Sequence, residues 1–318
     1  MLGGAILLVV LGHLSLIGGG AYSKIIYLFH MPLYFAISGF LYGYKEIGKR
    51  FNSLEFIKKK LISLGLPYLL FSVIYIMFNT SLQKYVHTNT QVDIPDILSL
   101  CWKPVAHYWF IWVLVIYFII VAFIGKSGRT LIALLLFGIV VALADGNKYD
   151  ALDPTYRKAL IYFVYFVGAS LLGVQFKSVE NIKISIRDKM LLFVVSLVFF
   201  WMFSSNIICI EYRPLQDMLV RIVGIVSFVA LIVLLKTVVF MQKILSKIGY
   251  YSWYIYLLHS YFLCAIRFFL AKIIPSGNSL IEIVLGMSGT VIGCMIIGKC
   301  CKKISWLDYI FYPYKLMK

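Results

Sequence analysis

Long apolar stretches separated by short polar connectors run along nearly the whole chain. About 20 consecutive apolar residues are enough for a helix to cross the hydrocarbon core of a bilayer. The pattern therefore predicts an all-α integral membrane protein, a single polytopic domain over residues 1–318 with about ten transmembrane helices in one bundle. The predicted spans are Leu2–Ile17, Ile25–Tyr44, Leu61–Phe78, Tyr108–Ile124, Thr130–Ala144, Ala159–Phe176, Met190–Ile210, Ile222–Phe240, Ile248–Ala271 and Ser279–Gly298.

Composition and charge support the membrane interpretation. Apolar residues make up 62% of the chain, charged residues only 14%, and the mean hydropathy is +0.93. A net charge of +17 would suggest nucleic acid as the partner of a soluble protein, but here the basic residues gather in alternate connectors. One side of the predicted topology carries more than twice as many Lys and Arg as the other, so the positive-inside rule places both termini in the cytoplasm. We expect membrane lipids, and no nucleic acid, around the basic loops.

Two histidines, His13 and His30, lie inside the first two apolar stretches. Ionisable side chains are expensive in hydrocarbon, so each is a hypothesis for a functional site. The topology puts them at similar depth, and a connector as short as Gly18–Lys24 usually joins antiparallel neighbours. A shared site is therefore plausible. The six cysteines show no metal-ligand spacing, and we predict no metal.

Five segments resemble, in order, the signatures of the membrane acyltransferase 3 family, which includes bacterial O-acetyltransferases of surface polysaccharides. They are LLVVLGH, FHMPLYFAISGF, LPYLLF, WFIWVL and IGYYSWYIYLLH, and the resemblance extends along almost the whole chain. The resemblance implies a multi-pass protein of the bacterial cytoplasmic (inner) membrane. It also implies transfer of an acyl group, usually acetyl from cytoplasmic acetyl-CoA, to a hydroxyl of a glycan or lipid-linked sugar. Acetyl-CoA would then be a donor substrate, with no permanently bound cofactor.

The histidine that matches His13 is the catalytic candidate of that family. A neutral imidazole can take the proton of a sugar hydroxyl as it attacks a thioester, which makes His13 the predicted general base. An acyl-imidazole intermediate is the other chemical route, and a packing role is the alternative without chemistry. His30 could orient His13, bind the acceptor or cap the helix break expected at Pro32. Relatives often carry a basic residue eleven positions before the first histidine, and here that position is Leu2.

A basic segment, Lys58, Lys59 and Lys60, precedes the LPY sequence on the predicted cytoplasmic side. Coenzyme A carries several phosphate charges, so a basic mouth would attract and position its nucleotide end. The Arg-x-x-Arg pattern of the family falls on Lys60 and Ser63, and neither carries a guanidinium fork. Positive-inside topology and contact with lipid headgroups explain the same charges without a donor site.

A polar stripe and two tryptophans complete the predicted substrate path. Ser252, Tyr256 and His259 are spaced to share one face of a late helix. This stripe could line a substrate path or only bond neighbouring helices. Trp109 and Trp112 could stack on a sugar ring, although tryptophans at such positions usually form the interfacial aromatic belt.

Arg221 has Asp217 one helical turn before it, and we expect the arginine to extend toward an interface, with the aspartate available as a partner. The competing functional class is a transporter or flippase for a lipid-linked sugar, because many spans with buried polar groups suit both classes. The sequence shows no repeated pair of broken helices to support that class.

Overall fold

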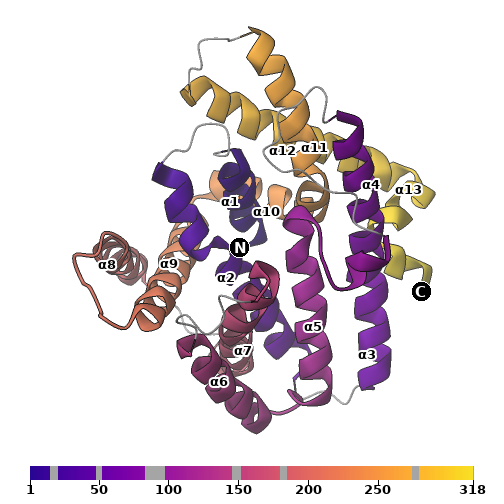
Figure 1. The fold of residues 1–318 in the computed structure, drawn as a ribbon. Helices are drawn as coiled ribbons and strands as arrows, with labels where there is room; N and C mark the ends of the chain where they lie inside the picture. The colour runs from indigo at the N-terminus through magenta and orange to yellow at the C-terminus, as the bar shows by residue number, and fades with distance from the viewer. Residues whose placement is uncertain are drawn as a thin grey trace. The chain divides into compact units, whose positions relative to one another are not determined.

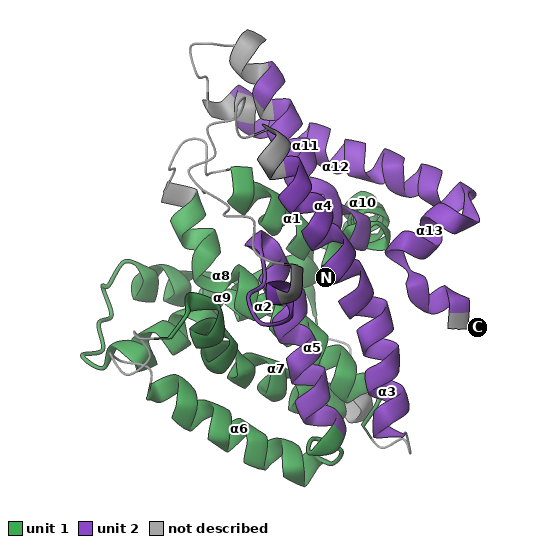
Figure 2. Ribbon diagram, turned by 45° about the vertical axis from the view of Figure 1, so that its right-hand side comes forward, with its two compact units in different colours: residues 1–50, 123–252 green, residues 51–122, 253–318 purple. Residues whose placement is uncertain are grey.

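The computed structural model describes residues 1–14, 21–47, 52–82, 97–144, 152–179, 185–273 and 279–317. In these ranges the chain forms helices and turns and no strand, which confirms the all-α prediction (Figure 1). The helices form two compact units, each built from two separate stretches of the chain (Figure 2).

Unit 1 comprises residues 1–50 and 123–252. It contains both histidines of the first two apolar stretches. Its helices are α1 (Leu2–Leu14), α2 (Ala21–Lys45), α6 (Gly128–Leu143), α7 (Pro154–Val179), α8 (Ile186–Ser204), α9 (Arg213–Leu235) and α10 (Val239–Tyr250).

Unit 2 comprises residues 51–122 and 253–318. Apart from one end residue each of α5 and α11, it holds α3 (Ser53–Lys60), a π-helical turn (Leu61–Gly65), α4 (Leu66–Leu82), α5 (Trp109–Phe123), α11 (Ser252–Ile273), α12 (Ser279–Lys303) and α13 (Ser305–Phe311). Three short 3₁₀ segments, Ile97–Cys101, Ala106–Tyr108 and Pro313–Met317, complete it.

Six helical segments in the described part of the chain are long and apolar enough to cross a membrane. They are Ser23–Lys45, Ser53–Phe78, Ala106–Phe123, Pro154–Phe176, Arg213–Leu235 and Ile283–Lys303. At about 1.5 Å per residue, the first of these is roughly 34 Å long and exceeds a hydrocarbon core of about 30 Å. The chain is thus a multi-pass membrane protein, while the count of ten spans and the orientation of the termini stay predictions.

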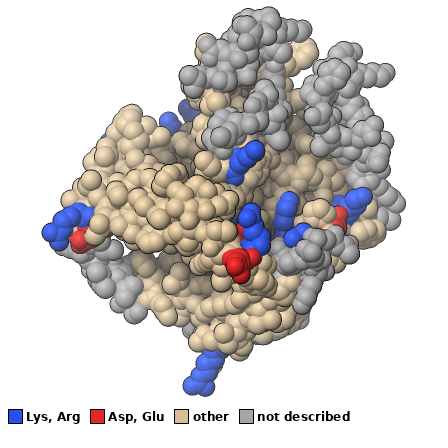
Figure 3. Space-filling view, turned by 60° about the vertical axis from the view of Figure 1, so that its left-hand side comes forward, with Lys and Arg blue, Asp and Glu red and all other residues tan. Residues whose placement is uncertain are grey.

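Apolar side chains cover much of the exposed surface. On α8 the exposed residues include Leu191, Leu192, Val195, Phe199 and Trp201. Figure 3 shows one face on which uncharged residues dominate and Lys and Arg form small separate groups. In water such apolar surface would drive association, whereas lipid tails would cover it.

Close backbone contact joins α2 to α7 within unit 1. A Cβ on Gly39 would meet the backbone of Phe166, and one on Gly43 would meet the backbone of Ser170. In the other direction, a Cβ on Gly173 of α7 would meet the backbone of α2 at Phe40. Small residues spaced by four are the usual device for close helix packing in membranes, where packing itself supplies the attraction. This contact fixes the helix that carries His30.

The helix α1 also packs through glycines. A Cβ on Gly3 would meet the α10 backbone at Leu245 and Gly249, and one on Gly4 would meet Phe228 and Ile232 of α9. The sequence predicted a span through Phe240 and a connector after it. The structure instead ends α9 at Leu235 and starts the short helix α10 at Val239. The short helix α10 packs part of one face against α1, and most of its side chains are exposed.

A polar contact closes the end of unit 2. Asp308 of α13 is buried and accepts hydrogen bonds from the Tyr254 hydroxyl and the Lys315 ammonium. Burial acts to raise the pKa of this carboxyl. The hydrogen bonds from Lys315 and Tyr254 outweigh burial and hold the pKa below its usual range.

Candidate active site

His13 lies in the last turn of α1 and is half-buried. Gly12 beside it faces α2, because a Cβ there would lie 3.5 Å from Ile26 and 3.9 Å from the Tyr27 ring. The Tyr27 hydroxyl donates a hydrogen bond of 3.3 Å to the Gly12 carbonyl. The segment Gly12–His13 is therefore fixed against the turn of α2 that precedes His30.

His30 is almost fully buried, with 2% of its surface exposed. Its Nδ1 lies 2.9 Å from the Ile26 carbonyl oxygen. A carbonyl can only accept, so Nδ1 carries the proton and Nε2 is the ring nitrogen that can accept one. The Tyr27 ring meets the His30 ring edge-on at 4.9 Å. Tyr27 thus contacts both the residue before His13 and the ring of His30.

The helix α2 continues through Pro32 without a break in its assignment. Proline removes the N–H that would bond the Leu28 carbonyl four residues earlier. His30 bonds the Ile26 carbonyl instead, so this hydrogen bond does not cap the position that Pro32 opens. Of the three roles suggested by the sequence, capping is the one that the geometry does not favour.

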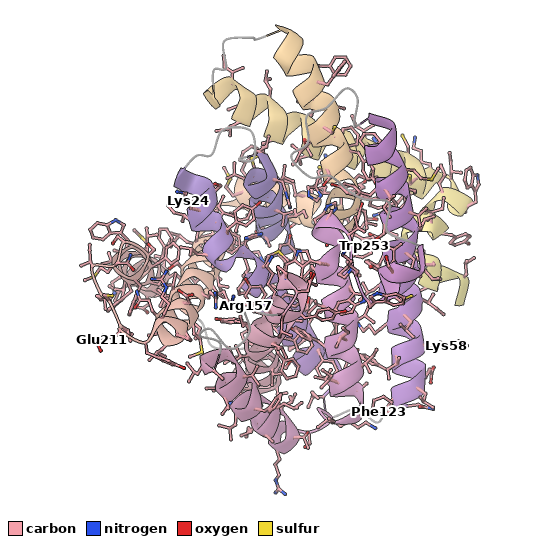
Figure 4. The ribbon with its side chains drawn as sticks, viewed as in Figure 1. Lys24, Lys58, Phe123, Arg157, Glu211 and Trp253 are labelled. Atoms are coloured by element: carbon pink, nitrogen blue, oxygen red, sulfur yellow. The ribbon has the colours of Figure 1, made fainter. Side chains whose placement is uncertain are left out.

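The three lysines of the basic segment have different surroundings. Lys58, labelled in Figure 4, and Lys59 are exposed on α3. Lys60 ends α3 with its ammonium 4.0 Å from the centroid of the Phe118 ring and 5.2 Å from that of Phe56. This geometry is a cation–π contact, which stabilises the helix pair and restricts the side chain. Lys58 and Lys59 are the ones that extend into solvent.

A π-helical turn begins directly after Lys60, at Leu61. Such turns are rare and occur often at functional sites. The Ser63 hydroxyl donates to the Lys60 carbonyl at 3.4 Å, so the second position of the Arg-x-x-Arg pattern is engaged with its own helix.

A second group of polar side chains is buried in unit 2. His107, 9% exposed, and His259, fully buried, have ring centroids 4.6 Å apart. His259 Nδ1 lies 2.8 Å from the Tyr256 carbonyl oxygen and 3.1 Å from that of Ile255. The Tyr256 hydroxyl donates to the His107 carbonyl at 2.7 Å. The predicted stripe members Tyr256 and His259 therefore belong to one buried cluster.

Ser260, which the sequence did not indicate, is also a member of this cluster. Its Oγ lies 3.1 Å from His107 Nδ1 and 3.5 Å from His259 Nε2. The available signal was the HS pair at the end of YIYLLHS, but nothing in the sequence indicated that His107 would meet it. A contact between residues 153 positions apart depends on tertiary packing.

The other predicted substrate-path residues are Trp109, Trp112 and Ser252. Trp112 donates its indole N–H to the Cys101 carbonyl at 2.7 Å, so that group is used within the protein. Trp109 and Ser252 are half-buried at the first positions of α5 and α11. Trp253, labelled in Figure 4, stacks on Tyr256 with ring centroids 6.0 Å apart.

Arg221 pairs with Asp217, as the sequence suggested. Its side chain is 19% exposed, its guanidinium lies 5.6 Å from the Tyr162 ring, and its nearest Asp217 oxygen is 3.7 Å away. The Tyr162 ring and the Asp217 carboxylate stabilise the guanidinium charge within unit 1. Among the described residues, no three His, Cys, Asp or Glu side chains group as metal ligands do.

Comparison with known proteins identifies the family. Residues 3–299 match the family pattern described as an acyltransferase domain. Nodulation protein NolL of Mesorhizobium japonicum is 31% identical over 133 residues, which are 39% of this chain and 34% of NolL, so the match spans about a third of that relative. No solved structure is significantly similar. Because the family pattern covers nearly the whole chain, the protein belongs to the acyltransferase 3 family.

Proposed function

We propose that the protein transfers acetyl from cytoplasmic acetyl-CoA to a hydroxyl of a cell-surface or lipid-linked glycan. His13 acts as general base toward that hydroxyl. The observation that carries the proposal is the hydrogen bond of Tyr27 to the Gly12 carbonyl, which holds the Gly-His segment of α1 beside the helix of His30. Family membership favours this enzyme over a transporter of the same glycan.

The chemistry requires a neutral imidazole near both reactants. A sugar hydroxyl is a poor nucleophile near neutral pH, and a positioned base that removes its proton accelerates the attack by about 10²–10⁴-fold. His13 is half-buried, so its ring is the accessible one of the pair, while the ring of His30 is buried. His30 is then a positioning residue, which acts with Tyr27 on the surroundings of His13.

On the donor side, Lys58 and Lys59 attract the phosphates of coenzyme A, and Lys60 keeps the end of α3 packed. This assignment requires the basic segment to face the cytoplasm, where acetyl-CoA is made. The excess of Lys and Arg in alternate connectors supports that orientation, with both termini cytoplasmic in a bacterial inner membrane. Tags at the two termini should resist protease in intact spheroplasts and be cut after permeabilisation.

The proposal is tested with purified protein in lipid nanodiscs, with radiolabelled acetyl-CoA and surface glycan from a strain that lacks the gene. We expect His13→Ala to lower acetyl transfer by about 100-fold or more, since it removes the base. Added imidazole should restore part of the activity to His13→Ala. The same substitution at His87, a histidine in a polar stretch of the sequence, is the matched control. Full acetyl transfer by His13→Ala would refute the proposed base.

A further inference from the structure

We infer that Ser260 is a covalent acyl-transfer site, at which the acyl group of the donor is held as a serine ester before it passes to the acceptor. The inference rests on the proposed function for the donor and the acceptor. It adds a second reactive group, in unit 2, to the histidines of unit 1.

The tautomer of His259 makes its free ring nitrogen a base beside Ser260. Its Nδ1 lies within hydrogen-bond distance of two carbonyl oxygens, Tyr256 at 2.8 Å and Ile255 at 3.1 Å. Since carbonyls only accept, Nδ1 carries the proton and Nε2 presents a lone pair. The Oγ of Ser260 lies 3.5 Å from that Nε2. A nucleophile beside a base, with the base oriented by a third group, is the arrangement that activates serine in enzymes.

His107 also contacts the Ser260 hydroxyl. Its Nδ1 is 3.1 Å from Ser260 Oγ, so the hydroxyl lies between two imidazoles and either ring can exchange a proton with it. The residue before it, Ala106, has a left-handed backbone with φ of 48°. Such a conformation is unfavourable for a residue with a Cβ, and strained residues persist mainly where function requires them. The Tyr256 hydroxyl holds this segment through the His107 carbonyl at 2.7 Å.

Ser260 is also more exposed than the two histidines beside it. The two histidines are buried, whereas Ser260 is half-buried. Ser260 is therefore the most exposed of the three residues. Serines that only stabilise membrane helices commonly bond a carbonyl of their own helix, as Ser227 bonds the Val223 carbonyl at 2.8 Å.

The reaction balances in two steps. In the first, Ser260 Oγ attacks the thioester carbonyl, the C–O bond forms, and the C–S bond breaks. The hydroxyl proton passes to His259 Nε2 and then to the departing thiolate, which leaves as coenzyme A thiol. In the second step the sugar hydroxyl attacks the serine ester. The new sugar ester forms as the bond to Oγ breaks, and the proton of the sugar hydroxyl passes to Oγ.

The test is to trap the ester in the full-length protein in nanodiscs. Protein is incubated with radiolabelled acetyl-CoA without acceptor and quenched in acid, and the peptide that contains Ser260 is analysed by mass spectrometry. We expect one acetyl group on Ser260 in the wild type. Label and transfer should both be lost in Ser260→Ala. Ser288→Ala is the matched control, because Ser288 is exposed and bonds only carbonyls of its own helix in the described structure.

Ser260→Cys gives a readout that a structural role would not move. A cysteine in this position should form a thioester, which neutral hydroxylamine cleaves, whereas the serine ester of the wild type resists neutral hydroxylamine. Wild-type protein that acetylates glycan without any acetyl on Ser260, or Ser260→Ala that transfers at the wild-type rate, would overturn the inference and leave the proposed function intact. Failure of the wild type to use acetyl-CoA would instead overturn the proposed function, and the serine ester with it.

Discussion

The contact between α2 and α7 gives a sharp prediction about stability. Gly39→Ala adds one methyl group where a Cβ would lie 2.7 Å from the carbonyl carbon of Phe166 and 3.0 Å from its Cα. These are backbone atoms, so no rotamer change can relieve the contact. The two helices must separate, or α2 must rotate, and either movement disturbs the helix that carries His30.

The magnitude follows from two opposing terms. Overpacking a close contact costs about 1–3 kcal/mol. Replacing glycine by alanine inside a helix returns about 1 kcal/mol of intrinsic propensity. The net effect is a loss of about 0–2 kcal/mol, and because the obstacle is backbone on both sides we expect the upper end of that range. At roughly 2–4 °C per kcal/mol, the Tm of Gly39→Ala should fall by about 4–8 °C.

The measurement is thermal unfolding of purified protein in detergent. Size-exclusion chromatography monitors how much folded protein is left after heating to each temperature. Gly128→Ala is the matched control: it lies at the start of α6, and a Cβ there meets nothing within 4 Å. The Tm of this control should stay within about 2 °C of the wild type or rise. If Gly39→Ala and Gly128→Ala unfold at the same temperature, close packing of α2 on α7 does not stabilise the protein.

Three further predictions concern charged groups. The double variant Lys58→Gln, Lys59→Gln should raise the KM for acetyl-CoA several-fold and leave Tm unchanged. The increase in KM should be smaller at high salt, which screens the attraction. A KM equal to that of the wild type at low salt would argue against a donor role. Lys60→Gln should instead lower the stability by about 0.5–1 kcal/mol through the lost cation–π contact, measured as a fall in Tm, and an unchanged Tm would contradict that structural role. Asp308→Asn should destabilise the protein by about 1–3 kcal/mol at pH 7, because the hydrogen bond from Lys315 loses its charged acceptor. The pKa of Asp308 is lowered in the folded protein, so its stabilisation is complete above the unfolded value of about 3.9 and is lost as pH falls through the folded pKa. The Tm difference between Asp308→Asn and wild type should therefore shrink below about pH 4, and a difference that is constant with pH would refute the assignment.

Local sequence patterns predicted much of the helical structure. The apolar stretches around His13 and His30 form α1 and α2, and the short connector did indicate helices that pack against each other. The pattern could not place the end of α9 at Leu235, because residues 236–250 mix apolar and basic positions in a way that suits a connector and a short surface helix equally.

The sites were predictable only where one segment carries the signal. The spacing of Tyr256 and His259 sets them on one face of α11, and both are buried there. The contact of Ser260 with His107 joins two segments far apart in sequence, and no local pattern marked His107 as its partner. The difference between Lys60 and its neighbours was equally hidden, because it depends on the Phe118 ring of another helix.

His30 and His259 share one local device that bears on the mechanism. Each histidine directs Nδ1 at the carbonyl four residues earlier in its own helix, Ile26 for His30 and Ile255 for His259. This hydrogen bond forms within a single helix, so it sets the tautomer whatever the neighbouring helices do, and it leaves Nε2 as the proton acceptor. An acyltransferase that holds its acyl group on a serine needs a neutral base in each of two steps, once for the serine and once for the sugar. The same helical hydrogen bond gives His259 the tautomer required of a base toward Ser260, and it fixes the ring of His30, the positioning residue for His13.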